Sequence, residues 1–185
     1  MYSAGLRGIE FVGDAFDLGL LSSMNRKPPT HELQEKIVNY CENLGVKMMA
    51  FYVLGFPGQP KNGIIQTIDY SKYMNTSFAQ FTIATPFPGT KFYDEIKTSI
   101  TDNDDYENYS HFLPVIESEH YTADELLKFK EKGYEAHMLN FDMSNLKSVK
   151  NQKEIDVLFF GHLTSDRIQF LDYISKEGIP VSYTH

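Results

Sequence analysis

The chain is poor in cysteine and has no tryptophan: Cys41 is the one cysteine among its 185 residues. A single thiol cannot form a disulfide within the chain, and zinc and iron–sulfur sites need several thiolates. The histidine and acidic residues also lack metal-binding spacings such as His-x-x-x-His or His-Glu-x-x-His. We therefore predict a reducing, cytoplasmic environment, no metal site formed by this chain alone, and a buried structural role for Cys41.

Basic residues are also scarce, with 17 Lys and Arg against 25 Asp and Glu and a net charge of −8. Nucleic acids and anionic membranes repel such a chain, so we predict neither as a partner. No apolar run reaches the length of a membrane span, and the first residues show no signal-peptide pattern. Phosphate-loop and Gly-x-Ser-x-Gly motifs are missing too, which argues against a kinase or a hydrolase.

What the chain does contain is an alternation of apolar runs and amphipathic segments. The apolar runs predict strands at residues 7–12, 46–54 and 78–84. The middle run is almost continuously apolar, which indicates a strand buried on both faces. Helices are predicted at residues 30–44, 62–75 and 90–100. Because single helices separate the strands, we predict an α/β fold with about three parallel βα units.

The apolar positions also predict which face each helix turns toward the core. In the first helix they recur at spacings of three and four, at Leu33, Ile37, Cys41 and Leu44. In the second helix Asn62 is the predicted N-cap. Its predicted inward side chains are Ile64, Ile65, Ile68 and Tyr73.

Each predicted strand ends in a loop rich in glycine or proline or in acidic residues: GDAFD from residue 13, GFPGQP from residue 55 and TPFPGT from residue 85. The carboxyl ends of parallel strands meet at one edge of a sheet, where such folds bind ligands. A glycine after a buried strand lets a ligand approach closely, and it also serves a purely structural turn. The three loops are therefore the candidate ligand site, with both interpretations of the glycines open.

The remaining sequence predicts helices and a short tail. We predict the βα units over residues 1–100 and a helical segment over 101–143, whose main helix starts at a capping box of Thr122 and Glu125. A polar linker is predicted at 144–153 and a truncated βαβ unit at 154–185. The tail resembles the first βαβ unit of a Rossmann-like sugar-nucleotide glycosyltransferase, in which the Gly161 turn faces a phosphate. A small βαβ flap explains the same residues.

The strand–loop motifs, taken in order, resemble the second half of the radical S-adenosylmethionine (SAM) barrel. The motifs are GIEFVGDAFDLGLLSSMNR, MMAFYVLGFPGQP and FAQFTIATPFPGTKFYDE. The likeness covers the chain from Ala4 to Met143 and is strongest to the subfamily that often carries a cobalamin-binding domain before the barrel. It implies that residues 1–100 form a partial (β/α) barrel made of the last three βα units. It also implies S-adenosylmethionine as cofactor, and a 4Fe–4S cluster and cobalamin in the intact parent enzyme.

The resemblance also assigns cofactor-binding residues. Asp14 stands at the position of the family's acid that accepts the ribose hydroxyls, and Glu10 within the strand is a rival. The family's Gly-Phe-Pro-Gly-Glu-Thr loop carries Gln59 and Pro60 here in place of its last two residues, which removes a charge and a cap hydroxyl. The residues that would line the methionine and adenine of SAM are Gly55, Phe56, Pro57, Gly58, Ala84, Thr85 and Pro86.

The family's cluster-binding Cys-x-x-x-Cys-x-x-Cys loop and its glycine-rich second-strand motif are missing. The resemblance therefore implies a fragment or split half of a radical SAM enzyme that has no catalytic residue of its own and is inactive alone, with SAM binding that is weak or undetectable. Its parent would carry out SAM-derived radical chemistry on a small organic substrate, such as methyl transfer or oxidative cyclisation. The missing half is one expected partner, and self-association through exposed sheet edges is another. A non-catalytic binding remnant and a glycosyltransferase-related scaffold are the alternatives.

Overall fold

The structure is a computed structural model that describes residues 2–101, 106–139, 157–160 and 181–184. The chain divides into two compact units, Met1–Phe141 and Asp142–His185. In the second unit, strands β4 (Val157–Phe160) and β5 (Val181–Thr184) pair in parallel. The predicted linker and the predicted helix of the tail lie outside the described residues, and the predicted domain limits stay predictions.

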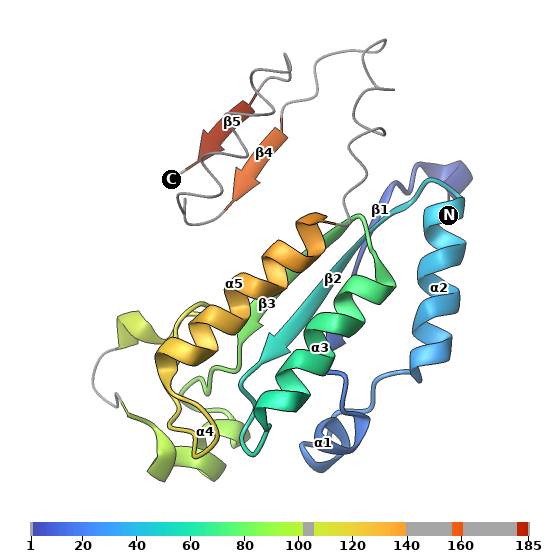
Figure 1. The fold of residues 1–185 in the computed structure, drawn as a ribbon. Helices are drawn as coiled ribbons and strands as arrows, with labels where there is room; N and C mark the ends of the chain where they lie inside the picture. The colour runs from blue at the N-terminus through green and yellow to red at the C-terminus, as the bar shows by residue number, and fades with distance from the viewer. Residues whose placement is uncertain (1, 102–105, 140–156, 161–180, 185) are drawn as a thin grey trace. The chain divides into compact units, whose positions relative to one another are not determined.

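Three parallel strands form the sheet of the first unit, in the order β1 (Gly8–Asp14), β2 (Lys47–Leu54) and β3 (Phe78–Ile83). Helix α2 (His31–Asn43) connects the first pair of strands, and α3 (Lys61–Met74) connects the second pair. The predicted α/β class with three parallel strands is therefore confirmed (Figure 1). The shorter elements are η1 (Tyr2–Ala4), α1 (Leu18–Ser23), α4 (Lys91–Ile96), η2 (Lys97–Ser99) and η3 (Tyr106–Asn108).

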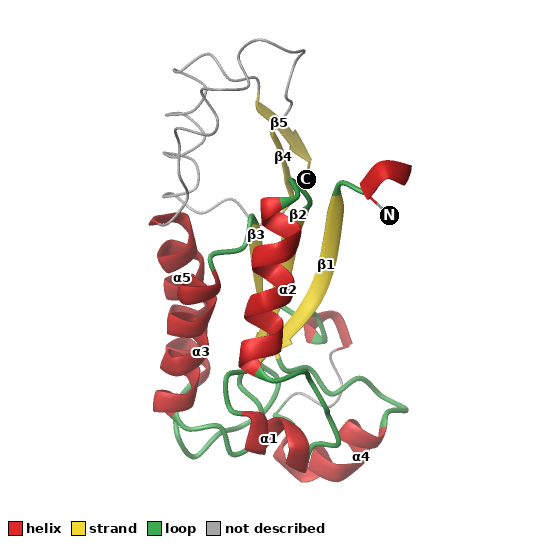
Figure 2. Ribbon diagram, turned by 90° about the vertical axis from the view of Figure 1, so that its right-hand side faces the viewer, coloured by secondary structure: helices red, strands yellow, loops and turns green. Residues whose placement is uncertain are grey.

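Helices α2, α3 and α5 (Ala123–Leu139) lie on one side of the sheet, and α1 and α4 lie near the ends toward which the strand arrows point (Figure 2). The β2 side chains that face these helices are 0% exposed: Met48, Ala50, Tyr52 and Leu54. They pack with Val38 of α2, Ile64 of α3 and Leu126 of α5. Burying a large apolar side chain contributes roughly 1.5–3 kcal/mol, so this contact holds the sheet to its helices.

The opposite face of the sheet is less covered. Val12 of β1 pairs with Phe51 of β2, and Phe78 of β3 pairs with Met49 of β2, so these side chains share that face. Phe51 and Met49 are half-buried, while Val12 and Phe78 are 53% and 54% exposed. The prediction that the middle strand is buried on both faces is therefore wrong for the described part of the chain.

Helix α2 buries a different face from the predicted one. Its buried side chains are Gln34 and Val38, and Cys41 is a free thiol that is half-buried and packs against the core. The predicted core residues that are instead 48%, 43% and 40% exposed are Leu33, Ile37 and Leu44. Gln34 tolerates burial because its Nε2 donates to the Pro29 carbonyl (2.8 Å) and its Oε1 accepts from the Tyr70 hydroxyl (3.1 Å).

Helix α3 also differs from the prediction in detail. It starts one residue before Asn62, which lies inside the first turn and does not cap the helix. Ile64 and Ile68 are buried as predicted. Ile65 and Tyr73 are 43% and 65% exposed, because they lie on the flank of the helix rather than on the face that meets the sheet.

The capping box of α5 is confirmed. The Thr122 N–H donates to Glu125 Oε2 (3.0 Å), and the Glu125 N–H donates to Thr122 Oγ1 (3.2 Å). The helix predicted at 90–100 consists of α4 followed by the 3₁₀ turn η2. Within the described ranges, no helix combines the length and apolar character needed to cross a bilayer.

Candidate ligand site at the carboxyl ends of the strands

The loops that follow β1, β2 and β3 meet in one apolar cluster. Each loop contributes one residue, and these residues are 1%, 2% and 3% exposed: Ala15, Phe56 and Ala84. Gly55 and Gly58 turn the chain after β2 with φ of +83° and +73°, a region that glycine enters without steric cost. The structure thus brings the three loops together at one edge, as the parallel strand order predicts.

Gln59 braces the loop after β2 from within. Its side chain is 0% exposed, and its Oε1 accepts hydrogen bonds from the N–H groups of Gly55 (2.8 Å) and Phe56 (3.3 Å). The Gln59 N–H in turn donates to the Phe56 carbonyl (2.9 Å). The turn therefore uses an acceptor oxygen at this position without requiring a charge. Sequence reasoning treats Gln59 only as a departure from the family's glutamate and misses this role.

Asp14 ends β1 with an ion pair. Its φ is +49°, which aspartate tolerates better than most residues with a side chain. The side chain is 6% exposed, and Oδ1 lies 2.6 Å from Nη1 of Arg26, whose guanidinium carbon lies 5.7 Å from the centroid of the Phe56 ring. Glu10 is exposed within the strand. Asp14 is therefore the acid at the loop edge, and Arg26, which sequence reasoning does not single out, is its partner.

Ala84, Thr85 and Pro86 are buried by the chain itself. The Thr85 hydroxyl lies 3.0 Å from the Ile83 carbonyl oxygen and 3.1 Å from that of Ser110, so its proton stays within the fold. None of the three residues lines the cavity beside the neighbouring loop. They form part of the frame of this edge.

A cavity of about 320 Å³ opens beside the loop after β2. Its walls are formed by Gly55–Gly58, by residues from 96 to 99 and by residues 116–121. A backbone hydrogen bond from the Glu117 N–H to the Ser99 carbonyl (2.8 Å) ties the second wall to the third. The volume is at the lower end of the range for small-molecule sites.

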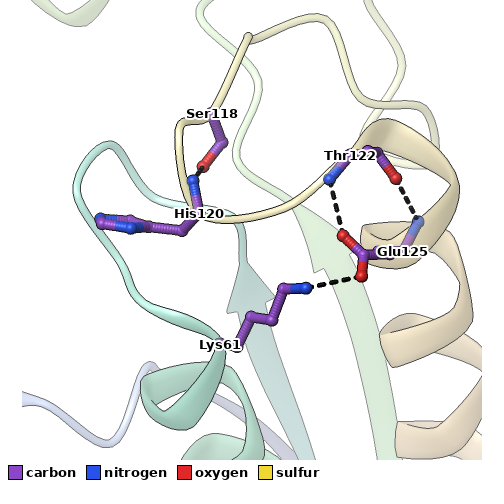
Figure 3. A network of polar contacts seen from close by, with 5 residues as sticks. All are labelled: Lys61, Ser118, His120, Thr122 and Glu125. Atoms are coloured by element: carbon purple, nitrogen blue, oxygen red, sulfur yellow. Dashed lines mark hydrogen bonds and ion pairs between the residues drawn. The ribbon is translucent and has the colours of Figure 1, made fainter.

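Most of the polar side chains of this cavity come from the segment before α5, and Thr98 and Ser99 add two hydroxyls. Ser118 Oγ accepts from the His120 N–H (3.2 Å), and the His120 ring projects from the same turn (Figure 3). Burial raises the pKa of the Tyr121 hydroxyl, so it stays neutral. Glu117 and Glu119 are the carboxylates of the lining, which includes no lysine or arginine. This composition favours a cationic ligand over an anionic one.

An ion pair fixes the end of this segment to α3. Lys61 Nζ lies 2.5 Å from Glu125 Oε1, next to the capping box of α5 (Figure 3). The hydrogen bond from Lys61 and, second, the one from the Thr122 backbone lower the pKa of the Glu125 carboxyl. Because both charged groups are exposed, the contact contributes position more than stability.

The described side chains offer no metal centre. No group of three His, Cys, Asp or Glu residues among them is placed to hold a metal ion. Cys41 is the one thiol of the whole sequence and lies in α2. An iron–sulfur cluster, which needs several thiolates, therefore does not fit the donors of this chain.

No protein-family model matches the chain. It is 27% identical over 133 residues to an uncharacterised methyltransferase of Pyrococcus horikoshii, and the matched region covers 71% of this chain and 26% of that protein. It is also 26% identical over 115 residues to bacteriochlorophyllide d C-12(1)-methyltransferase of Chlorobaculum tepidum, and the matched region covers 60% of this chain and 25% of that protein. The chain is thus similar in sequence to methyltransferases and spans about a quarter of their length.

Among solved structures, the chain is similar to a radical SAM methyltransferase, TsrM of Kitasatospora setae, determined with cobalamin and a 4Fe–4S cluster bound. The TM-score is 0.48 at 16% identity, over 77% of this chain and 33% of that one.

Proposed function

We propose that this chain forms one part of a SAM-dependent methyltransferase of the radical SAM class and carries loops that line the SAM site. The observation that carries the proposal is the sheet edge where the three loops meet, with the Gly-Phe-Pro-Gly turn beside a cavity. The two curated relatives, both named as methyltransferases, support the reaction class. The strand–loop motifs that resemble the radical SAM barrel supply the finer assignment.

Each part of the edge has a role in this proposal. The turn Gly55–Gly58 forms the wall nearest the methionine part of SAM, where glycine allows close approach. The carboxylates of Glu117 and Glu119 attract the positive sulfonium. Asp14 accepts hydrogen bonds from the ribose hydroxyls while its Oδ1 stays in the ion pair with Arg26.

The loop after β3 has the remaining role. Ala84, Thr85 and Pro86 are buried and lie outside the cavity, so in this proposal they frame the adenine side of the site from behind, and the Thr85 hydroxyl keeps their loop in place. The reaction itself needs a 4Fe–4S cluster, whose ligands this chain does not have. We therefore propose that the thiolates, and a cobalamin methyl carrier, belong to another polypeptide or to another part of a larger protein. The chain alone is then inactive.

The test is a titration of the full chain with SAM, followed by NMR. We expect weak, saturable binding with a Kd of about 1 mM or weaker, because other elements complete the site. The shifted amides should be those of Gly55–Gly58 and of residues 118–121. Shifts confined to other segments, or no shift at all, would contradict the proposal. A micromolar Kd that Asp14→Ala abolishes would instead show that this chain holds a complete SAM site.

A neutral analogue sharpens the test. S-adenosylhomocysteine lacks the methyl group and therefore the sulfonium charge, so we expect it to bind about threefold more weakly than SAM. Replacing both Glu117 and Glu119 with glutamine should remove this preference. The matched control replaces Glu131 and Glu135, two exposed carboxylates of α5, and should retain it. A preference that survives the first pair of substitutions excludes these carboxylates from the sulfonium site.

A non-catalytic binding domain is the second candidate, and the ion pair of Asp14 with Arg26 favours it, because the pair satisfies the predicted ribose acceptor internally. The two candidates differ for Arg26→Met. If Asp14 accepts the ribose hydroxyls, this substitution frees the carboxylate and strengthens SAM binding. If Asp14 is structural, the substitution lowers stability and leaves SAM binding unchanged.

A further inference from the structure

A second cavity, of about 520 Å³, lies between helices α2 and α3. We call it the α2–α3 groove. It shares no lining residue with the cavity beside the β2 loop. Its lining residues come from α2, from α3 and, in Phe16, from the loop after β1. The proposed methyltransferase site does not account for this groove.

Aromatic rings pack against one another along the wall of the groove, where Phe16 and His31 are half-buried and Tyr70 is buried. Phe16 stacks on His31 with ring centroids 4.4 Å apart and planes 12° apart. Tyr70 contacts both rings, with centroids 4.8 Å from His31 and 5.5 Å from Phe16. In the described part of the chain, the cation–π contacts involve other rings. The groove therefore presents aromatic rings that have no cationic partner of their own.

Carboxylates surround these rings. The lining includes Glu32, Glu35 and Asp69 and no lysine or arginine. Glu32 is paired with Lys36 (2.6 Å), but that lysine is not part of the lining. Asp69 is exposed, and its carboxylate has no hydrogen bond or ion pair with another described residue. The groove thus has an uncompensated negative charge.

Glu35 brings this charge to the rings. It accepts a hydrogen bond from the Tyr73 hydroxyl (2.8 Å), and its charge adds to burial in raising the pKa of Tyr70 to about 12. Tyr73 is 65% exposed. An incoming group can therefore contact the Tyr73 ring and reach the carboxylates of Glu35 and Asp69.

We propose that the α2–α3 groove is a docking site for an arginine side chain of a partner protein. A guanidinium is planar, so it stacks on aromatic faces and at the same time donates to a carboxylate. Lysine meets only the charge requirement, since its ammonium is a compact, strongly hydrated point charge that does not stack as a plane. The rings and carboxylates, with no lysine or arginine among the lining residues, are complementary to a guanidinium and only in part to an ammonium.

The test uses the full chain and a short peptide, acetyl-Ala-Arg-Ala-Trp-amide. Because the chain has no tryptophan, the fluorescence anisotropy of the peptide indole reports its binding without interference. The matched peptides carry lysine or the neutral isostere citrulline in place of arginine. We expect the arginine peptide to bind at least about tenfold more tightly than the citrulline peptide, with the lysine peptide between them. Equal binding of the arginine and citrulline peptides, or no binding, would overturn the proposal.

Paired variants separate the groove from the general negative charge of the chain. Glu35→Gln with Asp69→Asn should reduce the preference for arginine over citrulline to about twofold or less. Glu131→Gln with Asp124→Asn removes the same charge from α5, away from the groove lining, and should leave the preference intact. An equal loss in both double variants would mean non-specific attraction and refute the site. Circular dichroism checks the fold, and the peptide comparison on the unaltered chain holds even where a variant fails to fold.

Discussion

Replacing Gly55 with alanine tests how closely the loop after β2 packs against α5. A Cβ at Gly55 would lie 2.7 Å from Cδ2 of Leu126, inside van der Waals contact. The φ of +83° adds backbone strain, which for an L-residue costs about 1–2 kcal/mol. Overpacking adds about 1–3 kcal/mol, and the stiffer unfolded chain returns about 0.4–1 kcal/mol. We expect Gly55→Ala to lower the free energy of unfolding by about 1.5–4 kcal/mol in a urea titration followed by circular dichroism.

Gly58→Ala is the matched control. Its φ is +73°, but nothing lies within 4 Å of an added Cβ, so the variant carries the backbone strain without the contact. Gly58→Ala should therefore lower the free energy of unfolding by about 0.5–1.5 kcal/mol. In a Leu126→Ala background, Gly55→Ala should become milder, since the clashing methyl group is gone. Equal destabilisation of the two glycine variants would refute the close contact between Gly55 and Leu126. So would an effect of Gly55→Ala that shortening Leu126 leaves unchanged.

Three further predictions concern nearby contacts. Gln59→Leu removes the acceptor of the Gly55 and Phe56 N–H groups. Each buried unpaired N–H costs about 1–3 kcal/mol, so the urea midpoint should fall. A midpoint equal to that of the unaltered chain would contradict the role of Gln59 in holding the turn. Burial and, second, Glu35 raise the pKa of Tyr70 from near 10 to about 12. Because folding favours the neutral hydroxyl, the stabilisation from Tyr70 is complete below about pH 10 and is lost as the pH rises toward 12. Tyr70→Phe should therefore flatten the fall of the unfolding free energy over this pH range. Thr122→Ala removes the cap of α5 and should cost about 1 kcal/mol, which Thr122→Ser should largely restore.

The strand order and the loops of the first unit follow from the sequence because the signals are local. An apolar run of eight or nine residues that ends in glycine and proline defines a strand and its turn without knowledge of partners. The degree of burial is not local. Phe51 and Met49 are as apolar as Tyr52, yet they are only half-buried because the long helices α2, α3 and α5 pack on the other face of the sheet.

Helix α2 illustrates why amphipathic patterns can choose the wrong face. The pattern favours Leu33 and Ile37, but the helix turns Gln34 inward. The burial of Gln34 depends on the Pro29 carbonyl and on the Tyr70 hydroxyl of another helix, a contact 36 positions away. A hydrophobicity pattern has no access to such a partner. The partners of Gln34 therefore explain how a polar side chain occupies the buried face that the pattern assigns to apolar residues.

The residues of the candidate site also fall into those that the sequence predicts and those that it does not. Gly55 and Gly58 can be found from sequence, because a positive φ leaves few alternatives to glycine. Arg26 and the buried acceptor Gln59 cannot, since their roles depend on side-chain directions set by the fold. The resemblance to a family finds Asp14 but does not reveal that Arg26 already engages it. A family-derived role therefore needs the local contacts before it becomes an assignment.

The scarcity of basic residues has a spatial consequence that the net charge of −8 does not convey. Both cavities are lined by carboxylates and neither includes a lysine or an arginine. Charge alone thus gives the two sites the same preference for a cation, and their shapes must separate the ligands. One wall of the first cavity is a glycine turn that admits a sulfonium closely, whereas the α2–α3 groove has aromatic rings that suit a planar guanidinium. SAM should therefore leave the Tyr70 resonances unchanged, and the arginine peptide should leave those of Gly58 unchanged.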